Sequence, residues 1–430
     1  MYNPITYDTE NTKKQYLELL IKYLKIGRWN RRKYVLSEIE AYKKIIFADN
    51  EVKHDNKIDY YKYFILFDVL HFLGYSTGDI LPSKLLKLRE CHAEDFVDAD
   101  KEIVKRIIIS VRDAKKRLTN LLSNDNLIDE KEYIKLIRRN LVFRKIESFD
   151  IMVTATMSAG KSTFINALIG KYVCLSQNMA CTSKIHSIIN KAFEDGYSSE
   201  YDHDLVMTAG KEELLNDNED NASNMIYVAT HYAGELCDSR IIIHDSPGVN
   251  FSGNKEHQMV AHRLIKRKNY GLLFYVMNAT QLRTNDDEEH LEFVKKTIGT
   301  KIPVIFILNK VDSINYEEEN VEDIIRRQVS YLQEKGFDNP IVCPVSARAG
   351  YLSKQSQNGT LSKSEQRELY NLVDKFEEMN LEGYYNQILP DIEVESSTKE
   401  EVQLQKTCGL KYIERLIIKY LKGGIKDVAN

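Results

Sequence analysis

Residues 149–170 read FDIMVTATMSAGKSTFINALIG, and this stretch decides the fold of the domain that contains it. An apolar run from Phe149 to Thr154 is followed by a short loop of small residues and then by an amphipathic segment. A buried run of this length beside a helical pattern predicts a strand, a turn and a helix. Because Gly160 lacks a Cβ, the turn can bring backbone N–H groups close together where the helix begins.

The turn from Ala155 to Ser162 has the composition of a phosphate-binding loop. Its N–H groups and the dipole of the helix favour an anion, while Lys161 reaches the β and γ oxygens and Ser162 ligates Mg²⁺. Ala155 stands where the pattern has its leading glycine, which restricts the backbone there without abolishing the loop. The expected nucleotide contacts in this loop are Ala159, Gly160, Lys161, Ser162 and Thr163.

Two further motifs follow apolar runs. Asp245-Ser246-Pro247-Gly248 ends the run RIIIHD, where the carboxylate can hold Mg²⁺ through water and Gly248 can offer its N–H to a γ-phosphate. Asn309-Lys310-Val311-Asp312 follows IPVIFIL, and the Asp312 carboxylate can accept two hydrogen bonds from guanine. Adenine cannot supply that pair, so this motif disfavours ATP.

A fourth motif begins with Ser346 and Ala347 after the run IVCPV, where backbone N–H groups can meet the guanine O6. Ligands of open α/β sheets bind at the carboxyl ends of the strands. Four such motifs in this order therefore predict a site for a guanine nucleotide with Mg²⁺.

The rest of the chain has two periodicities. Residues 11–145 repeat apolar side chains at intervals of three and four, which predicts about five helices. Beyond residue 148, short apolar runs alternate with helical patterns, as in a buried parallel sheet. We therefore predict an all-α region, residues 1–145, that precedes an α/β P-loop GTPase domain with a mostly parallel sheet, residues 146–425. The polar segments 195–224 and 353–406 are predicted to be surface insertions.

Composition excludes several classes of function. The 430 residues carry a formal charge of −4, which is not the basic excess of a protein that coats nucleic acid. The six cysteines are scattered without a CxxC pair, and the N-terminal residues lack the pattern of a secretory signal. No apolar run approaches the length of about 20 residues that a membrane span requires. We predict a cytoplasmic protein with no nucleic-acid partner.

On these motifs the chain resembles the dynamin superfamily, and most closely the bacterial dynamin-like GTPases, over roughly residues 146–425. The resemblance rests on SAGKSTFINALIG (158–170), ACTSKI (180–185), HDSPGVN (244–250) and NKVD (309–312). Lys161 and Asp245 are 84 residues apart, an interval similar to that of the enlarged dynamin-type domain.

The resemblance implies a Mg²⁺-dependent enzyme that hydrolyses GTP to GDP and phosphate and is stimulated when two GTPase domains pair. Thr182 matches the threonine that closes over Mg²⁺ and the γ-phosphate, with Ser183 as the neighbouring alternative. Ser158 matches the serine that helps to hold a monovalent cation, K⁺ or Na⁺. The implied catalytic residues are Ser158, Lys161 and Thr182, and the implied Mg²⁺ residues are Ser162, Thr182 and Asp245.

Two departures from the family pattern leave alternatives open. Met157 stands where these proteins often have a glutamine that positions water, which favours a slow-turnover GTP-dependent switch as the second hypothesis. Only nine residues follow the amphipathic pattern of residues 410–421, so no complete stalk is expected after it. The partner is then either a second copy or a separate stalk-like protein. The segment 8–33 carries eight basic and three acidic residues, which leaves peripheral binding to a membrane as an alternative to a solvated helix face.

Overall fold

The computed structural model describes residues 145–174, 185–194, 196, 198–201, 205–206, 225–249, 255–315, 320–359 and 361–423, together with a few isolated residues before 145. The predicted all-α region, residues 1–145, lies almost entirely outside the described residues and stays a prediction. Thr182 also lies outside them, and so does most of the polar segment 195–224.

The chain divides into two compact units. One comprises Met1–Ile146 and Lys191–Ala209, and the other comprises Glu147–Asn190 and Gly210–Asn430. In the first unit, the short strands β3 (Ser199–Tyr201) and β4 (Leu205–Val206) pair antiparallel. The second unit contains the four motifs.

Seven strands of the second unit are hydrogen-bonded in the order β5-β2-β6-β1-β7-β8-β9. Every neighbouring pair is parallel except β2 and β6, which run antiparallel, so the predicted mostly parallel sheet is confirmed. The strands are β1 (Phe149–Ala155), β2 (Ile185–Asn190), β5 (Met225–Thr230), β6 (Ile241–Asp245), β7 (Leu272–Asn278), β8 (Val304–Asn309) and β9 (Ile341–Val345). All seven residues of β7 are buried, as expected for a central strand covered on both faces.

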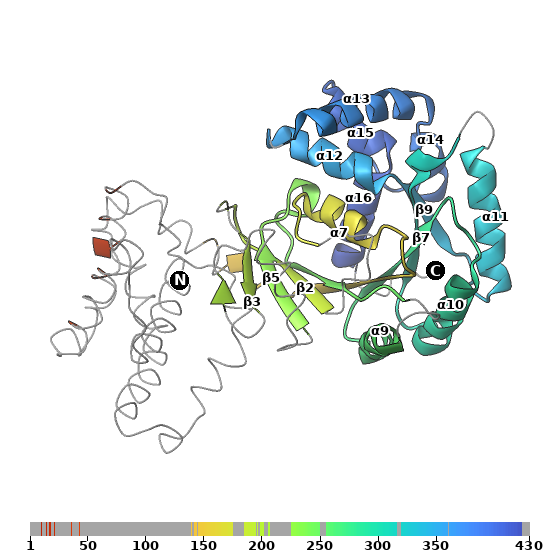
Figure 1. Ribbon diagram of the computed structural model, residues 1–430, viewed down its shortest axis with the longest axis horizontal. Coiled ribbons are helices and arrows are strands. Elements are labelled where there is room, and N and C mark those ends of the chain that lie inside the picture. The colour runs from red at the N-terminus through yellow and green to blue at the C-terminus, as the bar shows by residue number, and fades with distance from the viewer. Residues whose placement is uncertain are drawn as a thin grey trace, which may run out of the picture. The chain divides into compact units, whose positions relative to one another are not determined.

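Helices cover both faces of this sheet (Figure 1). One layer contains α7 (Lys161–Ile169), α12 (Ala347–Gln357) and α16 (Leu410–Gly423). Helix α16 is the amphipathic segment predicted at residues 410–421. Across the sheet lie α9 (Lys255–Arg267) and α10 (Asn285–Ile298), and α11 (Val321–Glu334) precedes β9. Phe164 of α7 meets Phe274 of β7 edge to face, with the ring centroids 5.5 Å apart, which anchors α7 on the sheet.

A buried ion pair fixes the C-terminal end of α7. The Lys354 ammonium of α12 donates to the Leu168 carbonyl at 2.7 Å and to the Glu414 carboxylate of α16 at 2.5 Å. A cation satisfies the last carbonyls of a helix and complements its dipole. The helix that follows the phosphate-binding loop is thereby joined to both of its neighbours in the layer.

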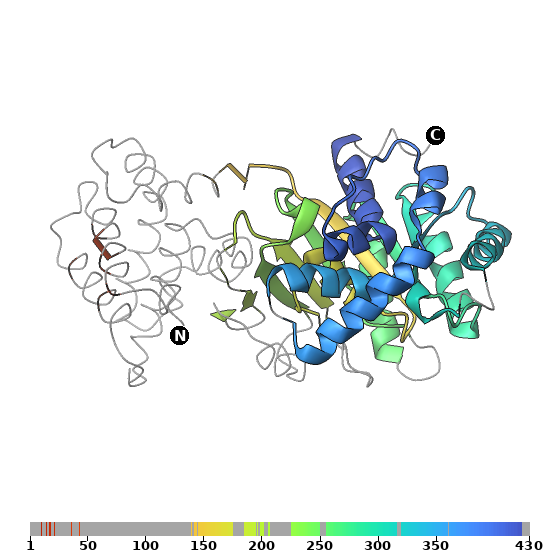
Figure 2. The ribbon, with the colours of Figure 1, turned by 90° about the horizontal axis from the view of Figure 1, so that it is seen from above.

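The polar segment 353–406 is more ordered than its composition suggested. It contains α13 (Lys363–Glu378), α14 (Glu382–Ile388) and α15 (Glu400–Thr407) in addition to the end of α12. Helix α13 begins with a capping box between Ser362 and Glu365. It buries one stripe of residues, Leu369, Leu372, Val373 and Phe376. Figure 2 shows α13 lying beside α12. The segment is a packed helical layer, which the prediction of a surface insertion did not specify.

Candidate functional site

The loop between β1 and α7 is tied to the segment that follows β6. The Met157 N–H donates to the Val249 carbonyl at 3.3 Å, and the Val249 N–H donates to the Ala155 carbonyl at 3.1 Å. The pairing of β1 with β6 thus continues past the ends of both strands. Two of the predicted motifs are therefore held side by side by backbone hydrogen bonds.

Gly160 ends this loop in the left-handed region, with φ of +83°, and is the N-terminal cap of α7. A Cβ at this position would lie 2.3 Å from Nδ2 of Asn309. Real Cβ atoms do not approach a heavy atom so closely, so both the backbone conformation and the space require glycine.

The Asn309 side chain connects three motifs and is only 2% exposed. Its amide donates to the carbonyls of Ala159 at 3.0 Å and Gly160 at 3.3 Å, while its Oδ1 accepts from the Ala347 N–H at 3.1 Å. One buried side chain therefore sets the distance between the phosphate-binding loop and the loops that follow β8 and β9.

Lys161 and Asp245 form a buried ion pair, with side chains 7% and 0% exposed. Oδ1 of Asp245 contacts the ammonium, but its Oδ2 is buried without a hydrogen-bond partner among the described residues. An anionic oxygen in this state fits a Mg²⁺ ion or its bound water, since Mg²⁺ prefers oxygen ligands. Ser162 follows the lysine in the first turn of α7, so its hydroxyl is a second oxygen in the same part of the site.

Cys174 is a neighbour of this pair that sequence reasoning missed. Burial raises the pKa of its thiol well above the ordinary value, the negative charge of Asp245 raises it further, and Lys161 opposes this effect. The Asn166 side chain holds the cysteine in place, because its Oδ1 accepts from the Cys174 N–H at 2.8 Å and its Nδ2 donates to the Cys174 carbonyl at 2.7 Å. A single cysteine in a loop gives no sequence signal for such a position.

The Asn-Lys-Val-Asp motif forms a tight turn after β8. Lys310 adopts φ of +64°, and residues Val311–Ser313 form the short 3₁₀ helix η4. The Asp312 side chain is partly exposed, whereas its backbone carbonyl accepts from the Lys375 ammonium of α13 at 2.7 Å. Sequence reasoning did not identify Lys375, because α13 was not expected to be a helix.

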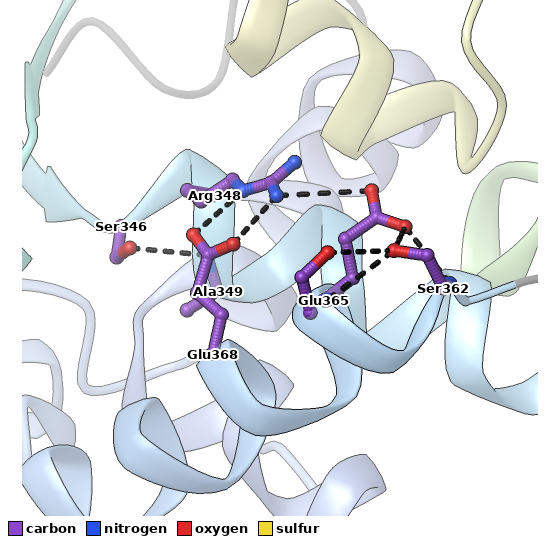
Figure 3. A network of polar contacts seen from close by, with 7 residues as sticks. Ser346, Arg348, Ala349, Ser362, Glu365 and Glu368 are labelled. Carbon is purple, nitrogen blue, oxygen red and sulfur yellow. Dashed lines mark hydrogen bonds and ion pairs between the residues drawn. The ribbon is translucent and has the colours of Figure 1, made fainter.

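The motif after β9 starts α12. The Ser346 hydroxyl accepts from the Ala349 N–H at 3.1 Å and caps the helix (Figure 3). The Ala347 N–H, predicted to face a guanine O6, here donates to Asn309. Its role toward a nucleotide stays a prediction.

The remaining predicted residues lie on the loops around this centre. Ser158 is exposed with φ of +63°, Thr163 is half-buried in the first turn of α7, and Gly248 lies against Met157. The Met157 side chain is 39% exposed. The contacts described above join Lys161 to Asp245, and they join Gly160 and Ala347 to Asn309.

Three polar side chains, Ser246, Thr154 and His290, lie close to the phosphate-binding loop. The Ser246 hydroxyl donates to the Val153 carbonyl at 3.1 Å, and the Thr154 hydroxyl lies 2.8 Å from Nε2 of His290 on α10. Burial lowers the pKa of His290 to about 3, so the ring is neutral near pH 7. These three side chains therefore support the loop through neutral hydrogen bonds and add no charge to the site.

Two negative findings concern the described residues alone. Among them, no group of three or more His, Cys, Asp or Glu side chains is placed to hold a metal ion by itself. Within the same part of the chain, no helix has the length and apolar character needed to cross a membrane.

A mostly parallel sheet with a glycine-capped loop before α7, a buried carboxylate at the end of β6 and an Asn-Lys-Val-Asp turn after β8 is the fold of a P-loop GTPase. The Dynamin family model matches residues 151–311, which run from β1 to the turn after β8. Residues 151–311 are therefore similar to the GTPase domain of the dynamin superfamily.

Two curated proteins are similar to this chain. A bacterial dynamin-like protein of Nostoc punctiforme is 25% identical over 196 residues, covering 42% of this chain and 27% of that protein. A probable chloroplastic transmembrane FZO-like GTPase of Arabidopsis thaliana is 27% identical over 220 residues, covering 50% of this chain and 21% of that protein. The chain thus spans roughly a quarter or less of the length of these relatives.

Solved structures show more distant likeness. A chain of an oligomerised bacterial dynamin pair is 16% identical with a TM-score of 0.42, covering 100% of this chain and 71% of that one. Toc33 from Arabidopsis thaliana with GDP and Mg²⁺ is 14% identical with a TM-score of 0.35, covering 69% of this chain and 94% of that one.

Proposed function

We propose that the second unit binds GTP together with Mg²⁺ and hydrolyses it to GDP and phosphate. The observation that carries this proposal is the Asn309 side chain, whose hydrogen bonds to Ala159, Gly160 and Ala347 join the proposed phosphate-binding and base-reading loops. Phosphoryl transfer requires little covalent chemistry from a protein, and positioning with charge neutralisation supplies most of the catalysis.

In this proposal Lys161 leaves Asp245 when the nucleotide binds. Its ammonium would turn to the β- and γ-phosphates, while Ser162 and Thr182 would hold Mg²⁺ and Asp245 would order the water of the metal. The unpartnered Oδ2 of Asp245 supports this exchange, because a buried carboxylate that loses its lysine needs another positive charge. Gly248 offers its N–H to the γ-phosphate.

The base is guanine in this proposal. The Asp312 carboxylate is partly exposed at the turn after β8, so it can accept hydrogen bonds from N1 and N2 of the base. Asn309 holds this turn against the phosphate-binding loop, and Lys310 lies along the loop with its Cε 3.6 Å from the position of a Cβ on Gly160. The Ala347 N–H would be shared between Asn309 and the guanine O6, with Ser346 beside it.

We further propose that two GTPase domains pair during turnover, with Ser158 holding K⁺ or Na⁺ near the phosphates. Ser158 is exposed in its loop, which suits a contact completed by a second copy. The test is phosphate release from GTP at increasing protein concentration, with Mg²⁺ and K⁺ present. The specific rate is expected to rise with concentration. A rate that stays flat would contradict pairing as the source of stimulation.

The second candidate function is a GTP-dependent switch with slow turnover. Met157 favours it, because its exposed thioether cannot orient an attacking water. In this case GTP stays bound while the phosphate release remains near that of a protein-free sample at every concentration. The partner would be a separate stalk-like protein or another protein recruited through residues 1–145. The proposed location is the cytoplasm, with peripheral membrane binding as the open alternative.

Asp312→Asn is expected to change the base that the protein selects. An amide cannot accept both hydrogen bonds from guanine but can pair with the carbonyl at C2 of xanthine, so kcat/KM for GTP should fall by about a hundredfold or more. The same variant should turn over xanthosine triphosphate better than the parent protein does. The measurement is kcat/KM for both nucleotides.

Asp374→Asn is the matched control for this substitution, because Asp374 is exposed on α13. It should behave as the parent protein. If Asp312→Asn keeps the parent's preference for GTP over xanthosine triphosphate, Asp312 does not read the base.

A further inference from the structure

Helix α13 makes polar contacts with the turn after β8 and with the first turn of α12, and both places are proposed to read the base. Lys375 reaches the turn after β8, and Glu368 with Glu365 reaches Arg348 directly after Ala347 (Figure 3). Glu368 and Lys375 are seven residues apart on one helix, which separates them by about 10 Å on the same side. Helix α13 therefore spans the turn after β8 and the first turn of α12.

The Lys375 contact acts on the backbone that carries the Asp312 carboxylate. The ammonium donates to the carbonyl of Asp312 at 2.7 Å and to that of Ile314 at 3.0 Å. Both carbonyls lie at the C-terminal end of η4, which comprises Val311–Ser313. A cation there satisfies carbonyls that the short helix leaves open, so it fixes the turn in one conformation.

The Arg348 guanidinium makes a bidentate contact with Glu368. Its Nε and Nη2 donate to the two carboxylate oxygens of Glu368 at 2.8 and 2.6 Å, and Glu365 lies 3.7 Å from Nη2. Bidentate geometry gives such a pair directional specificity. Because the side chains of Arg348 and Glu368 are 37% and 42% exposed, the solvent weakens this contact. It is therefore the weaker of the two anchors.

The packing of α13 makes it a rigid support for these contacts. Leu369 and Phe376 are buried at 3% and 0% exposure, and the Ser362–Glu365 capping box fixes the first turn. A long lysine side chain loses rotamer freedom when it is held between two carbonyls, and a fixed helix means that no backbone ordering adds to that cost. Lys375 is thus presented to the turn by a helix that is itself held by apolar contacts.

We propose that Lys375 is a positioning residue for base selection: it holds the turn after β8 so that the Asp312 carboxylate meets N1 and N2 of guanine, and Arg348 with Glu368 gives the second anchor. This inference rests on the proposed function. It assigns to α13 a role in specificity rather than in the hydrolysis step. Phosphate binding by the loop before α7 should then be independent of Lys375.

The test compares GTP with inosine triphosphate, which lacks the 2-amino group but has the same phosphates. Lys375→Met keeps the length of the side chain and removes its N–H donors. We expect the Kd for GTP to rise about tenfold, the Kd for inosine triphosphate to rise much less, and the preference between them to shrink. KM for GTP should rise while kcat at saturating GTP changes by less than about twofold.

Two further variants separate positioning from general stability. Lys375→Arg keeps a cation with several N–H donors and should restore most of the preference for GTP. Arg367→Met removes an exposed cation from the same helix and should match the parent protein. If Lys375→Met is unfolded in a thermal melt, Glu368→Gln provides the measurement, with an expected loss of preference of about threefold.

The outcomes distinguish this inference from the proposed function. If the parent protein binds GTP no better than inosine triphosphate and ATP, guanine is not the base that is read, and both proposals are overturned. If the parent protein prefers GTP and folded Lys375→Met keeps the same preference, only the role of Lys375 is overturned. A loss of preference that Lys375→Arg restores supports the role.

Discussion

Lys161→Ala is expected to reduce phosphate release from GTP to the level of a protein-free sample. The lysine is the proposed cation for the β- and γ-phosphates, and its removal takes away charge that the transferred group requires. The structure adds a second effect, because Lys161 is the buried partner of Asp245. Without it, a fully buried carboxylate loses its counter-charge, which should lower the free energy of unfolding by about 3 kcal/mol.

The two effects of this substitution can be measured separately. The double variant Lys161→Ala with Asp245→Asn removes the unpaired charge, so it should recover most of the stability in urea unfolding while remaining inactive. Lys296→Ala, which removes an exposed lysine of α10, is the control and should be unchanged in both assays. Turnover by Lys161→Ala at the parent rate would contradict the assignment of this loop.

Gly160→Ala is expected to weaken nucleotide binding through a steric clash and not through a loss of charge. The new Cβ would lie 2.3 Å from Nδ2 of Asn309, so the amide that joins the three motifs must move. The residue also has φ of +83°, where a side chain is strained. We expect nucleotide affinity to fall by about a hundredfold and the free energy of unfolding to fall by about 2 kcal/mol. Equilibrium binding and urea unfolding provide the two measurements.

Alanine substitutions at two other glycines distinguish the backbone strain of Gly160→Ala from its steric clash with Asn309. Gly299 has φ of +63° with no atom within 4 Å of its Cβ position, so Gly299→Ala carries the strain alone and should leave nucleotide affinity intact. Gly383 lies within α14 with open space and ordinary φ, so alanine there should stabilise the protein by about 0.5 kcal/mol. If Gly160→Ala binds nucleotide as tightly as Gly299→Ala does, the contact with Asn309 does not control the site.

Local sequence patterns predicted most of the strands that are continuous and apolar, but not β5. The runs that became β1, β6, β7, β8 and β9 are recognisable from their composition, and so is the terminal helix α16. Strand β2 was missed because it contains His186, Ser187 and Asn190 although all six of its residues are buried. Its polar side chains have partners in other parts of the chain, such as Nδ1 of His244, which lies 2.9 Å from the Ser187 hydroxyl. A single run of sequence does not contain those partners.

Helix α13 was missed for a related reason. Its buried stripe is narrow, and the exposed charged residues between the apolar ones dominate the composition of the segment. The 3.6-residue repeat of Leu369, Leu372, Val373 and Phe376 was the available signal. Lys375 could not be identified by the same means, because its target is the backbone of a turn 61 to 63 residues earlier.

The class of the domain follows from the sequence alone, since the order of the four motifs and their places after apolar runs are local properties of the chain. Only the tertiary structure decided which side chains meet. Lys161 lies against Asp245 because β1 and β6 are neighbours, and Asn309 reaches residues about 150 positions away because β8 ends at the same edge of the sheet. The spacing of apolar residues along a segment indicates which face of that segment is buried. The order of strands depends on how all segments pack together, and that order sets the distances in the site.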